Sequence, residues 1–158
     1  MTESEKTKQD YKIDFERIKE LLVSYEQKRK SGEIKRYNEE STKKDFILPL
    51  FEALGWNVYN RGKKNDSISA EETISKKRVD YGFRINGIPK FFLEAKSLKE
   101  EKIETNTKYI AQAIDYAWMK SCSWAILTNF ETIAVYNADW KDPNYGNNQL
   151  FLLNPSDF

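Results

Sequence analysis

A run of alternating residues around Asn86 and Gly87 constrains the fold of this chain more than any other feature of its 158 residues. Apolar residues alternate with polar or small ones before this pair, and the apolar positions are Val79, Tyr81, Phe83 and Ile85. Such a period of two is typical of a β-strand that buries one face. Asn-Gly is a strong signal for a tight hairpin turn, and a second strand is expected over residues 90–96. We therefore predict a β-hairpin over residues 79–96.

Three of the charged residues in these two strands lie away from the turn, where the strands are otherwise suited to burial. Asp80 belongs to the first strand, and Glu94 and Lys96 belong to the second. Because side chains two residues apart in a strand point to the same side, Glu94 and Lys96 share one face. This pairing of charge with burial makes the hairpin the most informative part of the sequence.

The register of the hairpin decides whether Asp80 joins Glu94. A regular two-residue turn pairs Ile85 with Ile88 and sets Asp80 opposite Leu93, so that Asp80 and Glu94 fall on opposite faces. A three-residue turn, or one β-bulge, shifts the register by one residue and brings Asp80 beside Glu94. We predict this shift.

With that shift, Asp80 and Glu94 form a pair of oxygen ligands, the kind that a hard cation such as Mg²⁺ or Mn²⁺ prefers. A divalent ion would offset the repulsion between the two carboxylates. Lys96 would project into the same site and either orient or deprotonate a water, or stabilise charge on a phosphate. The alternative is a salt-bridge cluster on a solvated face.

Composition excludes several mechanisms. The chain has no histidine and one cysteine, Cys122, which excludes a Ser-His-Asp triad, a histidine-ligated zinc and an internal disulfide. The net charge of +1 offers no general attraction for nucleic acid. No apolar run is long enough to span a bilayer, and the polar start is unlike a signal peptide, so we expect no membrane association and a cytoplasmic location.

The remaining pattern predicts an α/β sheet flanked by helices. Helices are expected over residues 10–30, 38–54 (closed by Gly55, with a bend at Pro49) and 106–119, and strands over 56–59, 124–128, 132–136 and 149–153, with a polar loop over 61–70. We expect three parts: a disordered tail over 1–9, an accessory helix within 10–35, and one domain over 36–158, which we expect to be a fragment of a larger protein.

Two further groups of residues lie where they can face a site. Helix 38–54 begins Asn38-Glu39-Glu40, and its two acids lie on either side of the apolar stripe, so periodicity does not choose between them. On helix 106–119, Gln112 and Tyr116 are one turn apart and share a face. Each group also has a structural explanation without a function. Glu39 and Glu40 can be first-turn acids that the helix dipole favours, and Gln112 and Tyr116 can be an ordinary pair at the boundary between core and surface.

These elements, taken in order, resemble the PD-(D/E)xK nuclease superfamily, and specifically the N-terminal nuclease domains of type I restriction-enzyme motor (R) subunits and of fused type II (type IIG) restriction-modification enzymes. The matching stretches are Asn38-Glu39-Glu40-Ser41-Thr42-Lys43, Ile47-Leu48-Pro49-Leu50, Leu54-Gly55-Trp56, Val79-Asp80-Tyr81, Glu94-Ala95-Lys96 and Gln112-x-x-x-Tyr116. They cover roughly residues 36 to 136. The Asp…Glu-x-Lys pattern alone is weak, and the ordered set is considerably more specific.

The resemblance implies an αβββαβ core and a set of site residues. Asp80 and Glu94, with Ala95, would hold the metal, and Lys96 would be the catalytic lysine. Glu39 matches the acid of the first helix, with Glu40 as the fallback, and Gln112 and Tyr116 match a motif beside the active site and the DNA backbone. The family usually has an arginine after the threonine, and this chain has Lys43, which keeps the charge and loses bidentate geometry.

The expected function is a Mg²⁺-dependent (Mn²⁺ possible as a substitute) DNA endonuclease domain of a restriction-modification enzyme. Double-stranded DNA would be the substrate, held through phosphates at Lys43, Lys44 and Arg78. Other domains or subunits, such as a helicase motor, a methyltransferase or a specificity subunit, would supply sequence recognition. The alternative is a catalytically inactive module that keeps the fold to bind DNA or a partner subunit.

Overall fold

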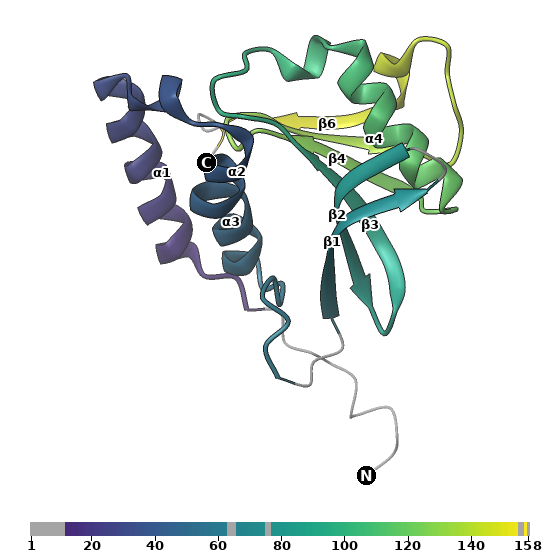
Figure 1. Ribbon diagram of the computed structural model, residues 1–158, viewed down its shortest axis with the longest axis horizontal. Coiled ribbons are helices and arrows are strands. Elements are labelled where there is room, and N and C mark those ends of the chain that lie inside the picture. Colours follow the sequence, from purple (N-terminus) through teal and green to yellow (C-terminus); the bar gives the residue numbers. More distant parts are fainter. Residues whose placement is uncertain (1–11, 63–65, 75–76, 155–156, 158) are drawn as a thin grey trace.

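The computed structural model describes residues 12–62, 66–74, 77–154 and 157. The tail expected over residues 1–9 lies outside this part of the chain. One mixed sheet runs through the molecule in the order β1-β2-β3-β4-β5-β6, with β3 and β4 parallel and the other neighbours antiparallel (Figure 1). The strands are β1 Asp66–Ile74, β2 Lys77–Ile85, β3 Ile88–Ala95, β4 Trp124–Thr128, β5 Ile133–Asn137 and β6 Gln149–Leu153.

Helices pack on both faces of this sheet and form two apolar cores. The helical elements are α1 Phe15–Ser31, η2 Glu33–Arg36, α2 Glu39–Thr42, η3 Lys43–Ile47, α3 Leu48–Ala53, η4 Ile103–Thr105, α4 Thr107–Met119 and η5 Tyr145–Asn148. Leu93 and Ala95 of β3 pack in the core with α1 and α3, whereas Phe92 packs in the core with α4. The period of two in β3 therefore separates the two cores, and the expected α/β fold with an N-terminal helix is confirmed.

Side-chain caps set the ends of α1. Asp14 accepts a hydrogen bond from the backbone N–H of Arg17 at 3.0 Å, and Gly32 ends the helix with a φ of 76°, which favours glycine. The helix therefore begins at Phe15, five residues later than the expected residue 10. Phe15 has the spacing from Ile18 and Leu22 that favours the buried face, but it lies in the first turn of the helix and is 67% exposed.

The helix expected over residues 38–54 is one continuous run made of α2, η3 and α3. Asn38 caps its start, and Ser41 completes a capping box. η3 is a π-helical turn, and Pro49 is the second residue of α3, which follows it. A proline lacks the N–H that an α-helix needs at this point, and a wider turn accommodates the change. The bend expected near Pro49 thus takes the form of a π-turn over residues 43–47.

The β2–β3 hairpin contains the predicted register shift. Ile85 pairs with Ile88 across a two-residue turn, but Phe83 pairs with Phe91, so Lys90 is an extra residue on β3. The rings of Phe83 and Phe91 stack with centroids 4.3 Å apart, which favours the shifted register. Because Tyr81 then pairs with Leu93, continuing the same register sets Asp80 opposite Glu94.

Two segments differ from the sequence-based expectation. Residues 56–59 form a turn, not a strand, and the expected loop over 61–70 contains the start of β1. β1 was missed because its sequence, DSISAEETI, is polar; pairing with β2 makes it a strand although its own pattern is weak. The spacing of Ile110, Ile114 and Trp118 along α4 favours burial of Trp118, but Trp118 is 44% exposed, and Ala113 is buried there instead.

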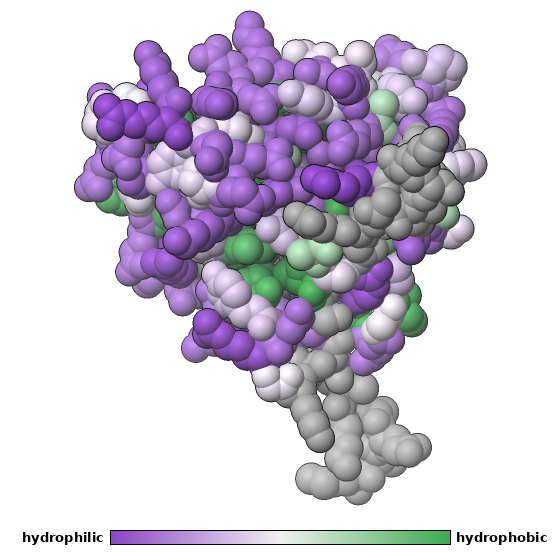
Figure 2. All heavy atoms as spheres, viewed as in Figure 1, coloured by the Kyte–Doolittle hydropathy of each residue, from purple (hydrophilic) through white to green (hydrophobic). Residues whose placement is uncertain are grey.

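The C-terminal half agrees closely with expectation. Asn106 caps α4 by accepting from the N–H groups of Lys108 and Tyr109, and β4 and β6 have the bounds that were expected. The face seen in Figure 2 is mostly hydrophilic, with an apolar area near its centre. None of the helices in the described part of the chain is long and apolar enough to cross a membrane.

Candidate active site

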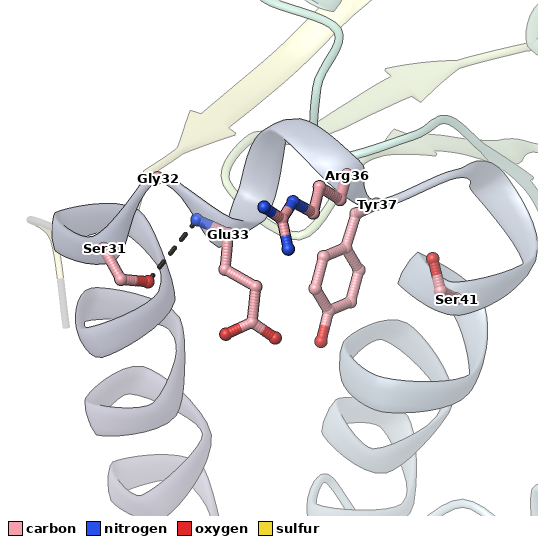
Figure 3. A pocket seen from close by; sticks show the side chains of 6 residues that line it. All are labelled: Ser31, Gly32, Glu33, Arg36, Tyr37 and Ser41. Carbon is pink, nitrogen blue, oxygen red and sulfur yellow. Dashed lines mark hydrogen bonds between the residues drawn. The ribbon is translucent and has the colours of Figure 1, made fainter.

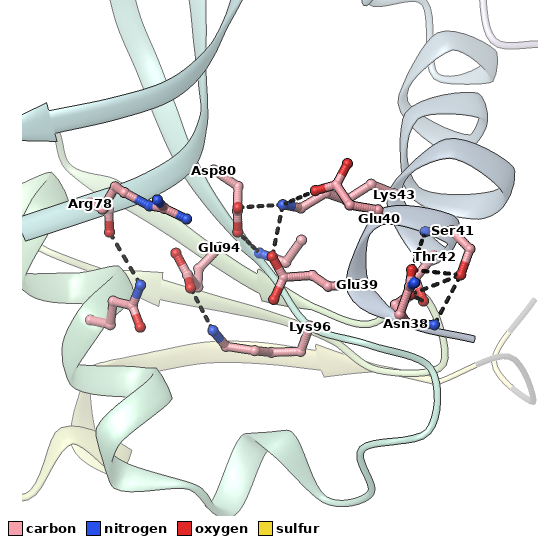
Figure 4. A network of polar contacts seen from close by, with 12 residues as sticks. Asn38, Glu39, Glu40, Ser41, Thr42, Lys43, Arg78, Asp80, Glu94 and Lys96 are labelled. Carbon is pink, nitrogen blue, oxygen red and sulfur yellow. Dashed lines mark hydrogen bonds and ion pairs between the residues drawn. The ribbon is translucent and has the colours of Figure 1, made fainter. Parts of the chain in front are cut away.

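The hairpin brings Asp80, Glu94 and Lys96 together at the C-terminal end of β3 (Figure 4). The ammonium Nζ of Lys96 lies 2.6 Å from Oε1 of Glu94, and both residues are at least nine-tenths buried. The backbone N–H of Ala95 donates to Oδ2 of Asp80 at 2.7 Å. Asp80 and Glu94 therefore share one buried cluster with Lys96, as the shifted register requires.

Glu94 is the most strongly perturbed acid of this cluster. Burial, followed by the negative charge of Asp80, raises the pKa of Glu94 to about 7, although Lys96 opposes the shift. Its second oxygen, Oε2, is buried and has no hydrogen-bond partner in the structure. A buried carboxylate oxygen without a partner is costly, and a cation bound there would remove the cost.

The start of the first helical run adds a second set of charges. Nζ of Lys43 lies 2.6 Å from Oδ1 of Asp80, 2.8 Å from Oε1 of Glu39 and 3.4 Å from Oε1 of Glu40. The side chain of Glu39 is 39% exposed and that of Glu40 is 80% exposed. Of the two acids that periodicity could not separate, Glu39 is the one turned towards the cluster.

The structure does not place Lys43 where a contact with DNA phosphates was expected. Its side chain is only 6% exposed, so it lies inside the carboxylate cluster and not on a surface open to DNA phosphates. Burial lowers its pKa, but hydrogen bonds to Asp80 and Glu39 outweigh burial and raise the pKa overall. Lys44 and Arg78, the other two candidates for phosphate contacts, are exposed.

Two hydrogen bonds attach α2 to the chain segment that follows Lys96. The backbone N–H of Leu98 donates to Oγ1 of Thr42 at 3.0 Å, and Oγ of Ser97 donates to the carbonyl of Tyr37 at 2.6 Å. All four groups belong to buried residues. They fix the start of the helix against the end of β3, which is why Lys43 reaches Asp80.

The two expected residues of α4 have different surroundings. Nε2 of Gln112 donates to the backbone carbonyl of Arg78 at 3.2 Å, which ties α4 to the start of β2, two residues before Asp80. Tyr116 is 0% exposed, and its ring packs edge-on against Phe92 with centroids 5.0 Å apart. Tyr116 therefore lies in the core below the site and not on a face open to the DNA backbone.

Tyr109 is a site residue that the sequence reasoning missed. The Nζ of Lys96 lies 4.4 Å from the centroid of its ring, a cation–π distance, and its hydroxyl donates to Glu100. Helical spacing could have found it, because Tyr109 stands one turn before Gln112 on the same side of α4.

The donor set fits a hard divalent cation. It consists of the carboxylates of Asp80 and Glu94, to which the backbone carbonyl expected at Ala95 would add a third oxygen. The side chain of Ala95 packs in the core with α1 and α3. All are oxygen donors, and Oε2 of Glu94 lacks a partner. Across the described ranges, no group of three or more His, Cys, Asp or Glu side chains could hold a metal ion, so a bound ion would depend on two carboxylates, main chain and water.

A separate cavity of about 460 Å³ lies between the end of α1 and the start of α2 (Figure 3). It is lined by Ser31, Gly32, Glu33, Arg36, Tyr37 and Ser41. None of these residues bonds to the carboxylates of Asp80 or Glu94, so this cavity does not extend the cluster.

Comparison with known proteins adds independent information. The family model "Type I restriction enzyme R protein N terminus" matches residues 67–144, which include Asp80, Glu94, Lys96, Gln112 and Tyr116. The chain is also 32% identical over 111 residues to the Escherichia coli protein "Type II restriction enzyme and methyltransferase RM.Eco57I". That match covers 65% of this chain and 11% of RM.Eco57I. No solved structure gives a significant match.

These matches confirm the resemblance inferred from the sequence: this chain is similar to the N terminus of type I restriction enzyme R proteins over residues 67–144, and to part of a type II restriction enzyme and methyltransferase.

Proposed function

We propose that this chain is the Mg²⁺-dependent nuclease domain of a restriction-modification enzyme and hydrolyses phosphodiester bonds of double-stranded DNA. The observation that carries the proposal is the β-bulge at Lys90, which sets Asp80 and Glu94 side by side with Lys96 and leaves Oε2 of Glu94 without a partner. The similarity to restriction enzymes supports the same reaction class.

In this proposal the chain's own groups have separate tasks. Asp80, Glu94 and the carbonyl of Ala95 would hold the ion, which supplies positive charge against the charge that develops on the phosphate. Lys96, fixed by Glu94 and by the ring of Tyr109, holds its ammonium where it can donate to a phosphate oxygen or orient the attacking water. The water oxygen bonds to phosphorus, the bond to the leaving sugar oxygen breaks, and that oxygen takes a proton.

Other parts of a larger protein would supply recognition. The matched relative is a restriction enzyme and methyltransferase in one chain, of which this chain spans 11%. Because the net charge of +1 gives the chain little general attraction for DNA, we propose that DNA is positioned by a helicase motor, a methyltransferase or a specificity subunit.

Plasmid cleavage tests this function. Supercoiled plasmid is incubated with the chain in Mg²⁺, in Mn²⁺ and in a chelator, and the nicked and linear products are measured. We expect metal-dependent cleavage that falls by at least about 100-fold in Asp80→Asn and in Lys96→Ala. Asp139→Asn and Lys99→Ala remove exposed groups of the same types and serve as matched controls with unchanged rates.

Two results would count against the proposal. Cleavage that survives Asp80→Asn and Lys96→Ala would place the chemistry elsewhere. Retarded DNA without cleavage in either metal would favour the inactive binding module.

A further inference from the structure

The ammonium of Lys43 is a point where three carboxylates meet. Asp80 of β2 approaches it at 2.6 Å, and Glu39 and Glu40 of α2 approach it at 2.8 and 3.4 Å (Figure 4). Two of these acids are one helical turn from Lys43, and the third comes from a strand 37 residues further along the chain. Nζ of Lys43 thus pairs with acids from two separate elements.

The position of this nitrogen is fixed by its surroundings. The Lys43 side chain is 6% exposed, and its Nζ lies 5.9 Å from the centroid of the Tyr81 ring. The helix that carries it is attached to the end of β3 through Thr42 and Leu98. Because three acids and an aromatic ring surround its ammonium, Lys43 belongs to the buried cluster and is not a surface side chain.

The cluster therefore has two unlike halves. In one half, Oδ1 of Asp80 and the acid of Glu39 already share a cation. In the other half, Oε2 of Glu94 is buried without a partner, although its Oε1 bonds to Lys96. Acidic groups at close range are stabilised by positive charge between them, and among the described residues Oε2 of Glu94 is the buried carboxylate oxygen of this cluster that still lacks a partner.

We infer that Lys43 is a built-in cation that takes the place of a second divalent ion, so the site binds a single Mg²⁺ at the Glu94 side. Glu39 then acts by holding Lys43 and is not a metal ligand. This inference rests on the proposed metal-dependent function and specifies its metal stoichiometry. It also assigns a structural role to Lys43, the residue after Thr42, at a position where the nuclease domains that this chain resembles usually have arginine.

Metal counting tests the inference without measuring cleavage. Mn²⁺ binding to the whole chain is followed by titration calorimetry and by the loss of the free Mn²⁺ electron-spin-resonance signal. We expect one equivalent for the unaltered chain. Lys43→Met keeps a side chain of similar length without the charge, so three acids remain around an empty position, and we expect a second equivalent there.

Matched variants assign that second ion. Lys43→Met combined with Glu39→Gln should return to one equivalent, because an acid of the new site is lost. Lys43→Arg keeps the positive charge and should stay at one equivalent, as should Lys44→Met, which changes an exposed neighbour. Glu39→Gln alone should also keep one equivalent, and Glu94→Gln should weaken Mn²⁺ binding by at least about tenfold.

The possible results separate this inference from the proposed function. Two equivalents in the unaltered chain, or one in a folded Lys43→Met variant, would overturn the role of Lys43 and leave the nuclease proposal standing. If Lys43→Met does not fold, as judged by circular dichroism, loss of the single equivalent in Glu39→Gln would overturn it instead. No Mn²⁺ bound by the unaltered chain would overturn both.

Discussion

At the scale of single residues, the ion pairs of the buried charged side chains define the cluster. Lys43 and Lys96 each pair with acids that burial would otherwise leave unbalanced. Glu94 retains one oxygen without a partner and a pKa raised to about 7 by burial and by Asp80. A residue selected for stability alone would not keep this arrangement, because a buried acid with a raised pKa lowers the stability of the metal-free fold.

Glu94 gives a pH dependence of stability with a definite sign. Its folded-state pKa of about 7 lies above its ordinary value of 4.5, so its contribution to stability is fully present below about pH 4.5 and is lost as pH rises through about 7. In a chelator, the free energy of unfolding relative to Glu94→Gln should therefore fall by up to about 3 kcal/mol between those limits. Urea titrations of both proteins at pH 5, 6, 7 and 8 measure it.

The comparison with Glu94→Gln removes the titration of all other groups. A constant difference between the two proteins across this range would show that Glu94 is not perturbed in the folded chain. Added Mg²⁺ should reduce the loss at high pH, because a cation favours the charged carboxylate.

At the scale of elements, the site depends on how two segments are held against each other. The bulge in β3 sets the face of Glu94 relative to Asp80. The link from Thr42 to Leu98 sets the start of α2 against the end of β3. Neither feature carries a charge, yet each places charged side chains that are far apart in the sequence.

Thr42→Val tests the link between α2 and β3. The valine has the same shape but no hydroxyl, so the buried N–H of Leu98 loses its partner, and we expect a loss of about 1–3 kcal/mol in stability. Thr105→Val is the control, because its hydroxyl bonds to the carbonyl of Lys102 at an exposed position. Thermal unfolding followed by circular dichroism compares the two. Equal and small effects would mean that the link does not hold α2 in place.

At the scale of the whole molecule, the chain has a mixed sheet with a buried charged cluster but a total charge close to zero. It has 26 basic and 25 acidic side chains, and several of the basic ones are used inside the fold. Lys43 and Lys96 are both buried in ion pairs. DNA binding by this domain alone should therefore depend on a few exposed cations such as Lys44 and Arg78.

Salt dependence tests that expectation. The affinity for a short DNA duplex should fall by at least about tenfold between roughly 50 and 200 mM salt. Replacing Lys44 and Arg78 together by alanine should lower the slope of log affinity against log salt by about two. Lys12→Ala with Lys30→Ala removes two exposed cations elsewhere and should leave the slope unchanged. Fluorescence anisotropy measures all three proteins, and an equal slope in the first variant would exclude those contacts.

Local patterns alone determined much of this fold. The periodicity and caps of α4, the bounds of β4 and β6 and the Asn-Gly turn all follow from neighbouring residues, because hydrogen bonding and packing within an element repeat along the chain. The same reasoning failed where pairing decides the outcome. The polar strand β1 exists because β2 lies beside it, whereas residues 56–59 pair with no strand among the residues that the structure describes.

The sequence by itself determined that Asp80, Glu94 and Lys96 are charged residues in buried strands, and it narrowed the register to two possibilities. Only the tertiary structure decided between Glu39 and Glu40, moved Lys43 from the surface into the cluster, and placed Tyr109 against Lys96. The physical reason is that these facts depend on distances between elements separated by long stretches of chain. Periodicity fixes the direction of a side chain within its element, but not which charge it meets there.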